Sequence, residues 1–210
     1  MKSKVSLINT IEQSNSTRRM KEVRMSNEIL LNPKFNTATF QCFTQEQVKE
    51  INKLIKKNIV GKESSTEPAE YVTKIGDFSV VPCMPLMKLI HPWLAECQKR
   101  NRDIFGYDIY WDFHLEGLNY NVYGTGGEYE WHIDVNNMIQ PLDAKLTCLL
   151  NLSEEPYEGG EFCIVGGVTP IEFTSGMGLV MTSLIGHKVT PITKGERITL
   201  SYWAVGPSWK

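Results

Sequence analysis

The spacing of hydrophobic residues along the chain changes near residue 107, from a helical to a strand-like pattern. Before that point two segments place apolar side chains at the spacing of an amphipathic helix. The first follows Thr44-Gln-Glu-Gln47, which has the composition of a capping box, and this helix is expected to end near Lys57. The second is expected from about Met84 to Arg102, with Pro85 in its first turn.

After residue 107 short β-prone runs alternate with turns rich in Gly, Pro and Asn. We expect strands at residues 107–114, 118–123, 128–134, 145–152, 160–164, 169–173, 178–181, 187–193 and 197–205. A first strand is expected within 35–43, and 61–69 is expected to be a loop. Strands at such regular spacing are typical of a sandwich or barrel. The predicted fold class is therefore mainly β with N-terminal helices: a jelly-roll core packed by two or three helices.

The length and polarity of the segments predict how the chain is organised. A chain of 210 residues is long enough for one domain with an appendage. Residues 1–32 are polar and are expected to form a flexible N-terminal arm. Residues 33–106 are expected to form a helical support layer of the same domain, and residues 107–210 the β core.

Charge and cysteine content narrow the classes of partner. The formal net charge of −2 gives no electrostatic reason to expect nucleic acid or an anionic membrane. The five cysteines form no CxxC pair, which is typical of reduced thiols in the cytoplasm. No apolar run approaches the roughly 18 residues that a membrane helix needs. We expect a cytoplasmic monomer or small homo-oligomer, without a membrane or nucleic-acid partner.

Two histidines and one aspartate are candidates for a metal site. His132 and Asp134 are two positions apart in a strand-like run, so their side chains are expected on one face of a sheet. His187 begins another predicted strand. Two imidazoles and one carboxylate with open positions suit non-haem Fe(II). Each motif alone has an ordinary alternative, because His-x-Asp is common and a histidine at a strand end is often held by hydrogen bonds.

Arg197 lies in a strand that is otherwise suited to burial, so it needs an anion. Fe(II) with two neutral histidines and one aspartate carries +1, and a dicarboxylate with Arg197 would bring the total to zero. A guanidinium also suits bidentate binding of a carboxylate. The alternative is a pair with Glu196 or another carboxylate at the rim.

In combination these residues resemble the iron- and 2-oxoglutarate-dependent dioxygenases, specifically the prolyl 4-hydroxylase-like branch. The resemblance covers about residues 118–203. In the order of the family, its elements are Tyr123, Tyr129, His132-x-Asp134, Leu149–Ser153, Tyr157-Glu-Gly-Gly-Glu-Phe162, Gly176-x-Gly178, His187 and Arg197. The resemblance implies a double-stranded β-helix that uses Fe(II), O2 and 2-oxoglutarate as co-substrate, with ascorbate as a candidate reductant.

The same resemblance implies roles for individual residues. His132, Asp134 and His187 would hold iron. The distal carboxylate of 2-oxoglutarate would meet Arg197, and the remaining candidates for that molecule are Tyr123 and Asn151, which stands where some members have tyrosine. Independently of the resemblance, Thr199 and Ser201 are expected to support the site, Ser201 by holding a water. Tyr129, Trp131 and Trp203 are candidates for an aromatic platform that contacts the substrate, and the alternative is that they pack in the core.

Strand parity gives a structural test of this assignment. If His187 and Arg197 lay on a simple hairpin turning at Lys194-Gly195, they would face opposite sides. Both point inward only if their strands belong to opposite sheets, with the chain crossing between them. Within the last strand, Arg197, Thr199, Ser201 and Trp203 then share the inner face, and Pro191 suits a strand edge or a kink.

The expected function is hydroxylation of a C–H bond in a prolyl or other residue of a peptide or protein, coupled to decarboxylation of 2-oxoglutarate to succinate. The alternative is hydroxylation of a free amino acid or small metabolite. A nucleic-acid demethylase is less favoured, because no second arginine follows Arg197. A non-catalytic cupin-like binding domain is less favoured, because all the candidate ligands are present. Asp134 favours hydroxylation over halogenation.

Overall fold

A computed structural model describes residues 37–66, 72–110, 117–134 and 142–209. In chain order its strands are β1 (Thr37–Gln41), β2 (Gly61–Ser65), β3 (Lys74–Pro82), β4 (Gly117–Tyr123), β5 (Glu128–His132), β6 (Leu142–Asn151), β7 (Glu158–Gly159), β8 (Phe162–Ile164), β9 (Met177–Thr182), β10 (His187–Val189), β11 (Ile192–Lys194) and β12 (Arg197–Pro207). The helices are α3 (Gln45–Asn58) and α4 (Cys83–Arg100), followed by the π-helical turn η1 (Asn101–Phe105). The predicted arm at 1–32 lies outside the described residues.

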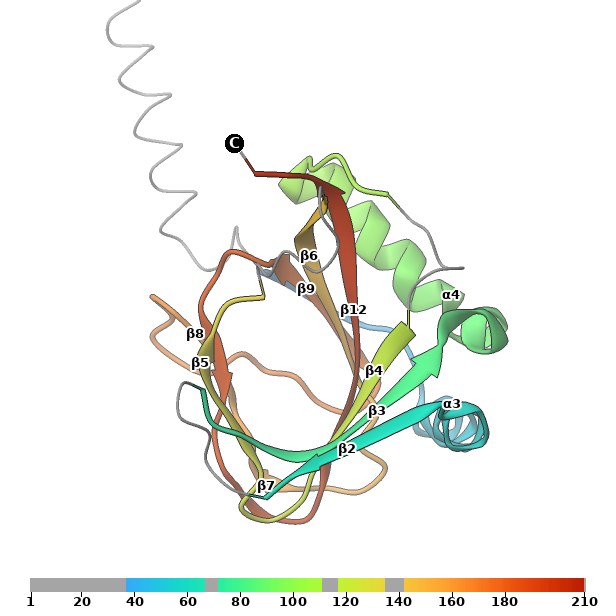
Figure 1. The fold of residues 1–210 in the computed structure, drawn as a ribbon, viewed down its shortest axis with the longest axis vertical. Helices are drawn as coiled ribbons and strands as arrows, with labels where there is room; N and C mark the ends of the chain where they lie inside the picture. The colour runs from blue at the N-terminus through green and yellow to red at the C-terminus, as the bar shows by residue number, and fades with distance from the viewer. Residues whose placement is uncertain (1–36, 67–71, 111–116, 135–141, 210) are drawn as a thin grey trace, which may run out of the picture.

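Ten of the strands form one antiparallel sheet that curls on itself (Figure 1). Its order is β1-β9-β6-β12-β4-β3-β5-β10-β8, with β2 paired to β3, and β7 and β11 pair separately. Both helices lie on one side of this sheet (Figure 1). The predicted fold class is confirmed: the domain is mainly β, shaped as a half-barrel, with N-terminal helices.

The long strand β3 joins the two halves of the curled sheet. Its first residues, Lys74 and Ile75, pair with β5, and its later residues, from Asp77 to Pro82, pair with β4. His187 lies in β10, beside β5 and β8, and Arg197 lies in β12, beside β4 and β6. The predicted crossing between the two strand groups is therefore confirmed.

Helix α3 begins where the capping box predicts. The Thr44 hydroxyl accepts a hydrogen bond from the Gln47 backbone N–H, and the Gln47 side chain accepts one from the Thr44 backbone N–H. These two bonds satisfy backbone donors that the helix leaves free at its start. The buried stripe contains Val48, Ile51 and Ile55, which fixes the helix against the sheet.

Helix α4 also lies against the sheet, but it ends differently from the prediction. The predicted single helix to Arg102 changes at Asn101 into the π-helical turn η1, which Gly106 closes at a φ of 67°. Near the helix centre the buried Trp93 indole donates to the carbonyl of Leu149 in β6, 3.1 Å away. The helix is therefore tied directly to a strand that lines the candidate site.

Five strand segments differ from the sequence prediction. Residues 61–65, expected as part of a loop, form the edge strand β2, and β3, which was not predicted, is its partner. The expected strand at 169–173 is reduced to a single bridge between Ile171 and Phe162, and the described part of 107–114 to one between Tyr110 and Val205. The support layer at 33–106 thus contributes strands β1 to β3 as well as helices. The strand expected at 187–193 divides into β10 and β11 around Pro191, which has no N–H to donate.

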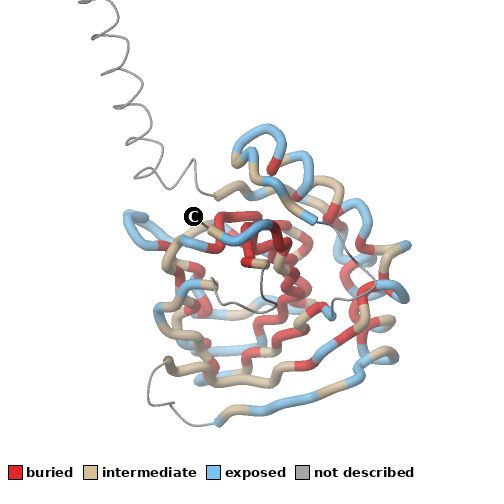
Figure 2. Tube along the Cα trace, turned by 45° about the horizontal axis from the view of Figure 1, so that its top comes forward, coloured by how far each residue is buried: buried red, intermediate tan, exposed pale blue. Residues whose placement is uncertain are grey.

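The buried side chains form two clusters on opposite faces of the central strands. Figure 2 shows the buried positions concentrated in these strands. The larger cluster lies between sheet and helices and includes Trp93, Leu150, Leu200 and Tyr202. A smaller one, around Leu149, Phe162 and Val189, lies inside the curl. This inner face holds the candidate site.

Candidate metal and co-substrate site

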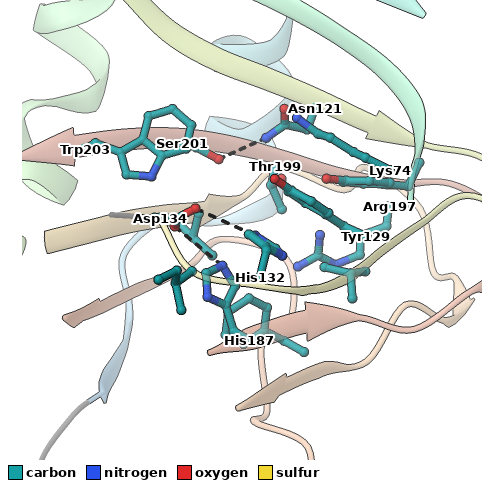
Figure 3. Close-up of a pocket in the computed structure, with 15 residues that line it drawn as sticks. Lys74, Asn121, Tyr129, His132, Asp134, His187, Arg197, Thr199, Ser201 and Trp203 are labelled. Atoms are coloured by element: carbon teal, nitrogen blue, oxygen red, sulfur yellow. Dashed lines mark hydrogen bonds and ion pairs between the residues drawn. The ribbon is translucent and has the colours of Figure 1, made fainter. Parts of the chain in front are cut away.

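The three predicted ligands converge at one point inside the curl (Figure 3). His132 ends β5, Asp134 follows two residues later, and His187 begins β10 directly opposite His132. Asp134 Oδ1 lies 3.7 Å from His132 Nε2, and Asp134 Oδ2 lies 3.5 Å from His187 Nε2. One ligand atom from each residue lies within 4.8 Å of the others, so the three side chains surround a single centre.

Backbone carbonyls orient both imidazole rings. His132 Nδ1 lies 2.7 Å from the carbonyl oxygen of Glu130, and His187 Nδ1 lies 3.1 Å from that of Ile185. Because a carbonyl can only accept, each Nδ1 must carry the hydrogen, which leaves each Nε2 lone pair free. Metal-binding histidines are commonly held in this way.

Asp134 is also held in place. Thr147 in β6 donates its hydroxyl hydrogen to Asp134 Oδ2 at 2.7 Å, and the Asp134 backbone N–H donates to the carbonyl of Ser183 at 3.1 Å. Thr147 was not identified from the sequence, although its place on the inward face of β6 was a usable signal. The carboxylate therefore has one fixed orientation.

The electrostatics of the cluster favour metal binding over an ion pair. Burial, with the neighbouring His187 as the second cause, lowers the pKa of His132 to about 4. His132 is therefore neutral at neutral pH, which is the form that ligates metals. Two imidazoles and one carboxylate, with the cavity on the remaining side, fit Fe(II).

An irregularity in β5 decides which aromatic residues reach the site. His187 pairs with His132, but Val189 pairs with Tyr129, so β5 has one extra residue in this interval. The Tyr129 ring therefore stacks on the His132 ring, with centroids 3.5 Å apart. Trp131 is 42% exposed, outside the pocket, with Lys188 over its ring. The expectation that Trp131 joins an aromatic platform was wrong.

A cavity of about 190 Å³ opens beside the three ligands. Its walls come from β3, β4, β5, β6, β8, β10 and β12. The side chains that β12 contributes are Arg197, Thr199, Ser201 and Trp203. These are the four residues that strand parity places on the inner face.

Arg197 is buried in this cavity with unused donors. It is 2% exposed, and its Nε and Nη2 atoms have no hydrogen-bond partner among the described residues. Its guanidinium carbon lies 5.8 Å from the ring centre of Tyr123 and 5.7 Å from that of Phe173. A buried cation in this state is costly unless an anion binds to it. The arrangement fits a carboxylate.

The candidates Tyr123, Ser201 and Trp203 differ in the hydrogen bonds that they already make. Tyr123 lines the cavity opposite Arg197, and burial raises the pKa of its hydroxyl, so this group remains a neutral donor. The Ser201 hydroxyl accepts from Asn121 Nδ2 at 2.9 Å. Trp203 Nε1 is buried and has no partner in the described part of the chain.

Lys74 also lines the cavity. The sequence analysis missed it because β3 itself was not predicted.

Asn151 is not among the residues that line the cavity. Its Nδ2 donates to the Phe173 carbonyl at 2.7 Å and to the Tyr157 hydroxyl at 3.2 Å, and its Oδ1 accepts from the Ser153 N–H at 3.0 Å. These bonds occupy its donors and its acceptor. The expectation that Asn151 binds the co-substrate is therefore dropped, and its contacts instead tie β6 to the segment before β9.

Comparison with known proteins identifies the matched part of the chain. The model of the 2OG-Fe(II) oxygenase superfamily matches residues 118–205. A PKHD-type hydroxylase of Acidovorax ebreus is 34% identical over 92 residues, which are 40% of this chain and 40% of that protein. The chain thus spans about 40% of the length of the curated relatives it matches.

Solved structures show the same fold. The viral collagen prolyl hydroxylase of Paramecium bursaria Chlorella virus-1 superposes with a TM-score of 0.61 at 15% identity, covering 81% of this chain and 96% of that one. A prolyl hydroxylase of Trichoplax adhaerens, solved with a peptide of a hypoxia-inducible factor, gives 0.59 at 15% identity, covering 89% and 91%.

The segment that matches the superfamily model, residues 118–205, contains His132, Asp134, His187 and Arg197. This segment is similar in sequence to PKHD-type hydroxylases, and the fold of the chain is similar to that of prolyl hydroxylases. In the described part of the chain no helix is long and apolar enough to cross a membrane.

Proposed function

We propose that this protein hydroxylates a C–H bond of a prolyl or other residue in a peptide or protein, using Fe(II), O2 and 2-oxoglutarate. The observation that carries the proposal is the single cavity that joins two oriented imidazoles and a fixed carboxylate to a buried arginine with unused donors. The alternative for Arg197, an ion pair with Glu196 or another carboxylate at the rim, does not explain why its Nε and Nη2 atoms have no partner among the described residues.

His132, Asp134 and His187 would hold the iron, and Arg197 the distal carboxylate of 2-oxoglutarate. When bound, iron and 2-oxoglutarate supply the oxidising chemistry that inserts one oxygen atom of O2 into a C–H bond while 2-oxoglutarate becomes succinate and CO2. The charges of Fe(II), Asp134, a dicarboxylate and Arg197 sum to zero, so these four groups balance one another.

Other side chains of the cavity would orient the metal ligands and the co-substrate and exclude water. Thr147 keeps Asp134 Oδ2 directed at the metal centre, and the Tyr129 ring prevents the His132 ring from turning. The Tyr123 hydroxyl is available to donate to 2-oxoglutarate. Leu149, Phe162 and other apolar side chains line the cavity and keep bulk water from the reacting C–H bond.

The substrate class has two candidates. The peptide candidate is supported by the relatives, since they include prolyl hydroxylases and one was solved with a bound peptide. A free amino acid is favoured by the small volume of the cavity, about 190 Å³, and by Lys74, which is a second cation in the cavity wall beside Arg197.

The test compares formation of succinate from 2-oxoglutarate, with Fe(II) and O2, in wild type and in the Asp134→Ala variant. We expect loss of turnover in the variant, because the metal centre loses the one carboxylate that the described residues place there. Asp77→Ala, which removes a partly exposed carboxylate on β3 outside the cavity, is the matched control and should retain turnover. Equal turnover in wild type and Asp134→Ala would end the iron assignment.

The product is identified by mass spectrometry. A library of proline peptides and free amino acids is incubated with the protein, Fe(II) and 2-oxoglutarate, and products heavier by one oxygen atom are sought. Incorporation from labelled O2 shows that the oxygen comes from the gas. A product found only among free amino acids would select the alternative.

A further inference from the structure

Lys74 brings a second cation into the wall of the candidate site. It begins β3, pairs across the sheet with Tyr129, and lines the same cavity as the three ligands. Its Nζ lies 3.8 Å from the ring centre of Phe78 and 4.9 Å from that of Tyr129. Because Tyr129 stacks on His132, the ammonium lies one ring away from the metal centre (Figure 3).

The described contacts of Lys74 do not include an anion. Its ammonium contacts two aromatic faces, and no carboxylate of the described residues forms an ion pair with it. The surface lysines Lys62 and Lys194, by contrast, each have a carboxylate within 4.0 Å. Burial lowers the pKa of Lys74, and the Glu63 and Asp134 carboxylates oppose this shift from a distance. Aromatic faces replace only part of the hydration that a cation loses.

The charge balance of the loaded site leaves Lys74 without a counter-charge. Fe(II), Asp134, 2-oxoglutarate and Arg197 already sum to zero, so Lys74 adds one uncompensated positive charge to the cavity. The co-substrate cannot supply the missing anion, since its charge is fully used in that balance. The remaining source is the molecule that is hydroxylated.

The other free groups of the wall indicate the same kind of substrate. Trp203 Nε1 is buried in the cavity wall and donates to none of the described residues. Asn121 Oδ1 is a buried acceptor in the same wall that has no partner among the described residues. The unused Trp203 donor and the Lys74 ammonium match a group that carries acceptor oxygens.

We propose that Lys74 binds a carboxylate of the substrate, which makes the substrate an amino acid with a free carboxylate or a peptide with an acidic group beside the hydroxylated carbon. The inference rests on the proposed function and deepens it by naming the charge of the substrate. A carboxylate is bidentate and planar, so it can accept from the Lys74 ammonium and still present a second oxygen to another donor.

The test uses matched probes that differ only in charge. The full chain is loaded with Mn(II) and 2-oxoglutarate without O2, so that binding is measured without turnover. Calorimetric titrations then compare L-amino acids with their primary amides, and acetylated proline peptides with Asp or Asn beside the proline. We expect at least one acid to bind about tenfold more tightly than its amide, as a charge-assisted hydrogen bond in a cavity allows.

The variants show whether Lys74 produces this preference. Lys74→Met, of similar length but without charge, should reduce the ratio of acid to amide affinity to about one. Lys74→Arg should keep a preference for the acid, and Lys62→Met, on the outer strand β2, should match wild type. If the preference for the acid is seen among the free amino acids, the substrate is a small molecule. If it is seen for the Asp peptide over the Asn peptide, the substrate is an acidic peptide.

Three results would overturn the inference. They are equal binding of acid and amide in wild type, a preference that survives in Lys74→Met, and the absence of binding by every acid probe. A fourth, an equally large loss of 2-oxoglutarate affinity in Lys74→Met, would assign Lys74 to the co-substrate instead. Failure of wild type to bind 2-oxoglutarate in the presence of Mn(II) would remove the proposed function itself, so the two failures are distinguishable.

Discussion

The two faces of β12 show how one strand serves stability and chemistry at once. Ile198, Leu200 and Tyr202 lie under the helices in the larger buried cluster. Their neighbours in sequence project into the cavity, where Arg197 and Trp203 keep unused polar atoms. The helix-covered face gains free energy from apolar burial. The cavity face gives up part of that gain, because its polar groups are satisfied only when ligands bind.

The largest effect is expected from a substitution on the helix-covered face. Leu200 is fully buried. Leu200→Ala should lower the free energy of unfolding by about 2–5 kcal/mol, because it leaves a cavity between the sheet and the helices. Urea unfolding measures this, and calorimetry should show 2-oxoglutarate affinity within about twofold of wild type. A large loss of affinity in a variant that remains folded would show that the two faces are not independent.

A substitution on the cavity face should have the opposite profile. Arg197→Met removes the cation proposed to bind the distal carboxylate, so the dissociation constant of 2-oxoglutarate should rise about a hundredfold. The melting temperature of the ligand-free protein should stay equal or rise, since a buried cation without a partner is costly. Unchanged affinity for 2-oxoglutarate would remove Arg197 from the site.

A smaller effect is expected one layer away from the metal centre. Thr147→Val keeps the shape of the side chain but removes the hydroxyl that donates to Asp134 Oδ2. Affinity for Mn(II), measured by the paramagnetic signal of the free ion, should fall about tenfold. Thr147→Ser should restore most of it. If Val and Ser variants bind Mn(II) alike, the hydroxyl does not orient the carboxylate.

The smallest effect is expected at the start of α3, far from the cavity. Thr44→Ala removes the side-chain half of the capping box and should cost about 1 kcal/mol of unfolding free energy. Urea unfolding again gives the value, and 2-oxoglutarate affinity should not change. Thr44→Ser is the matched control, because serine caps a helix as well as threonine does. A Ser variant as unstable as the Ala variant would contradict the capping explanation.

The sequence predicted best those features that depend on periodic pattern and local chemistry. The capping box fixes the start of α3, and alternation along β12 places Arg197, Thr199 and Ser201 on the cavity face. The convergence of His132, Asp134 and His187 was also anticipated, because a family resemblance adds long-range information that periodicity lacks.

The features that were missed depend on long-range pairing. Residues 61–65 have no apolar alternation and form β2 only because β3 offers an edge. The extra residue in β5 brings Tyr129 to the face of His132, which simple alternation does not predict, and no local signal marks it. Asn151 stands in a family position, but its neighbours Phe173 and Tyr157 are brought to it by the tertiary fold. Lys74 was missed for the same reason as β3.

The continuity of β3 has a consequence for which diacid the cavity accepts. One end of β3 is bonded to β5, which carries His132, and the other to β4, which lies beside Arg197. A single backbone therefore sets the span between the metal centre and the guanidinium, and side-chain movement alone cannot shorten it by much. The site should discriminate by chain length: oxaloacetate, one methylene shorter, would leave a gap, and 2-oxoadipate, one longer, would have to buckle.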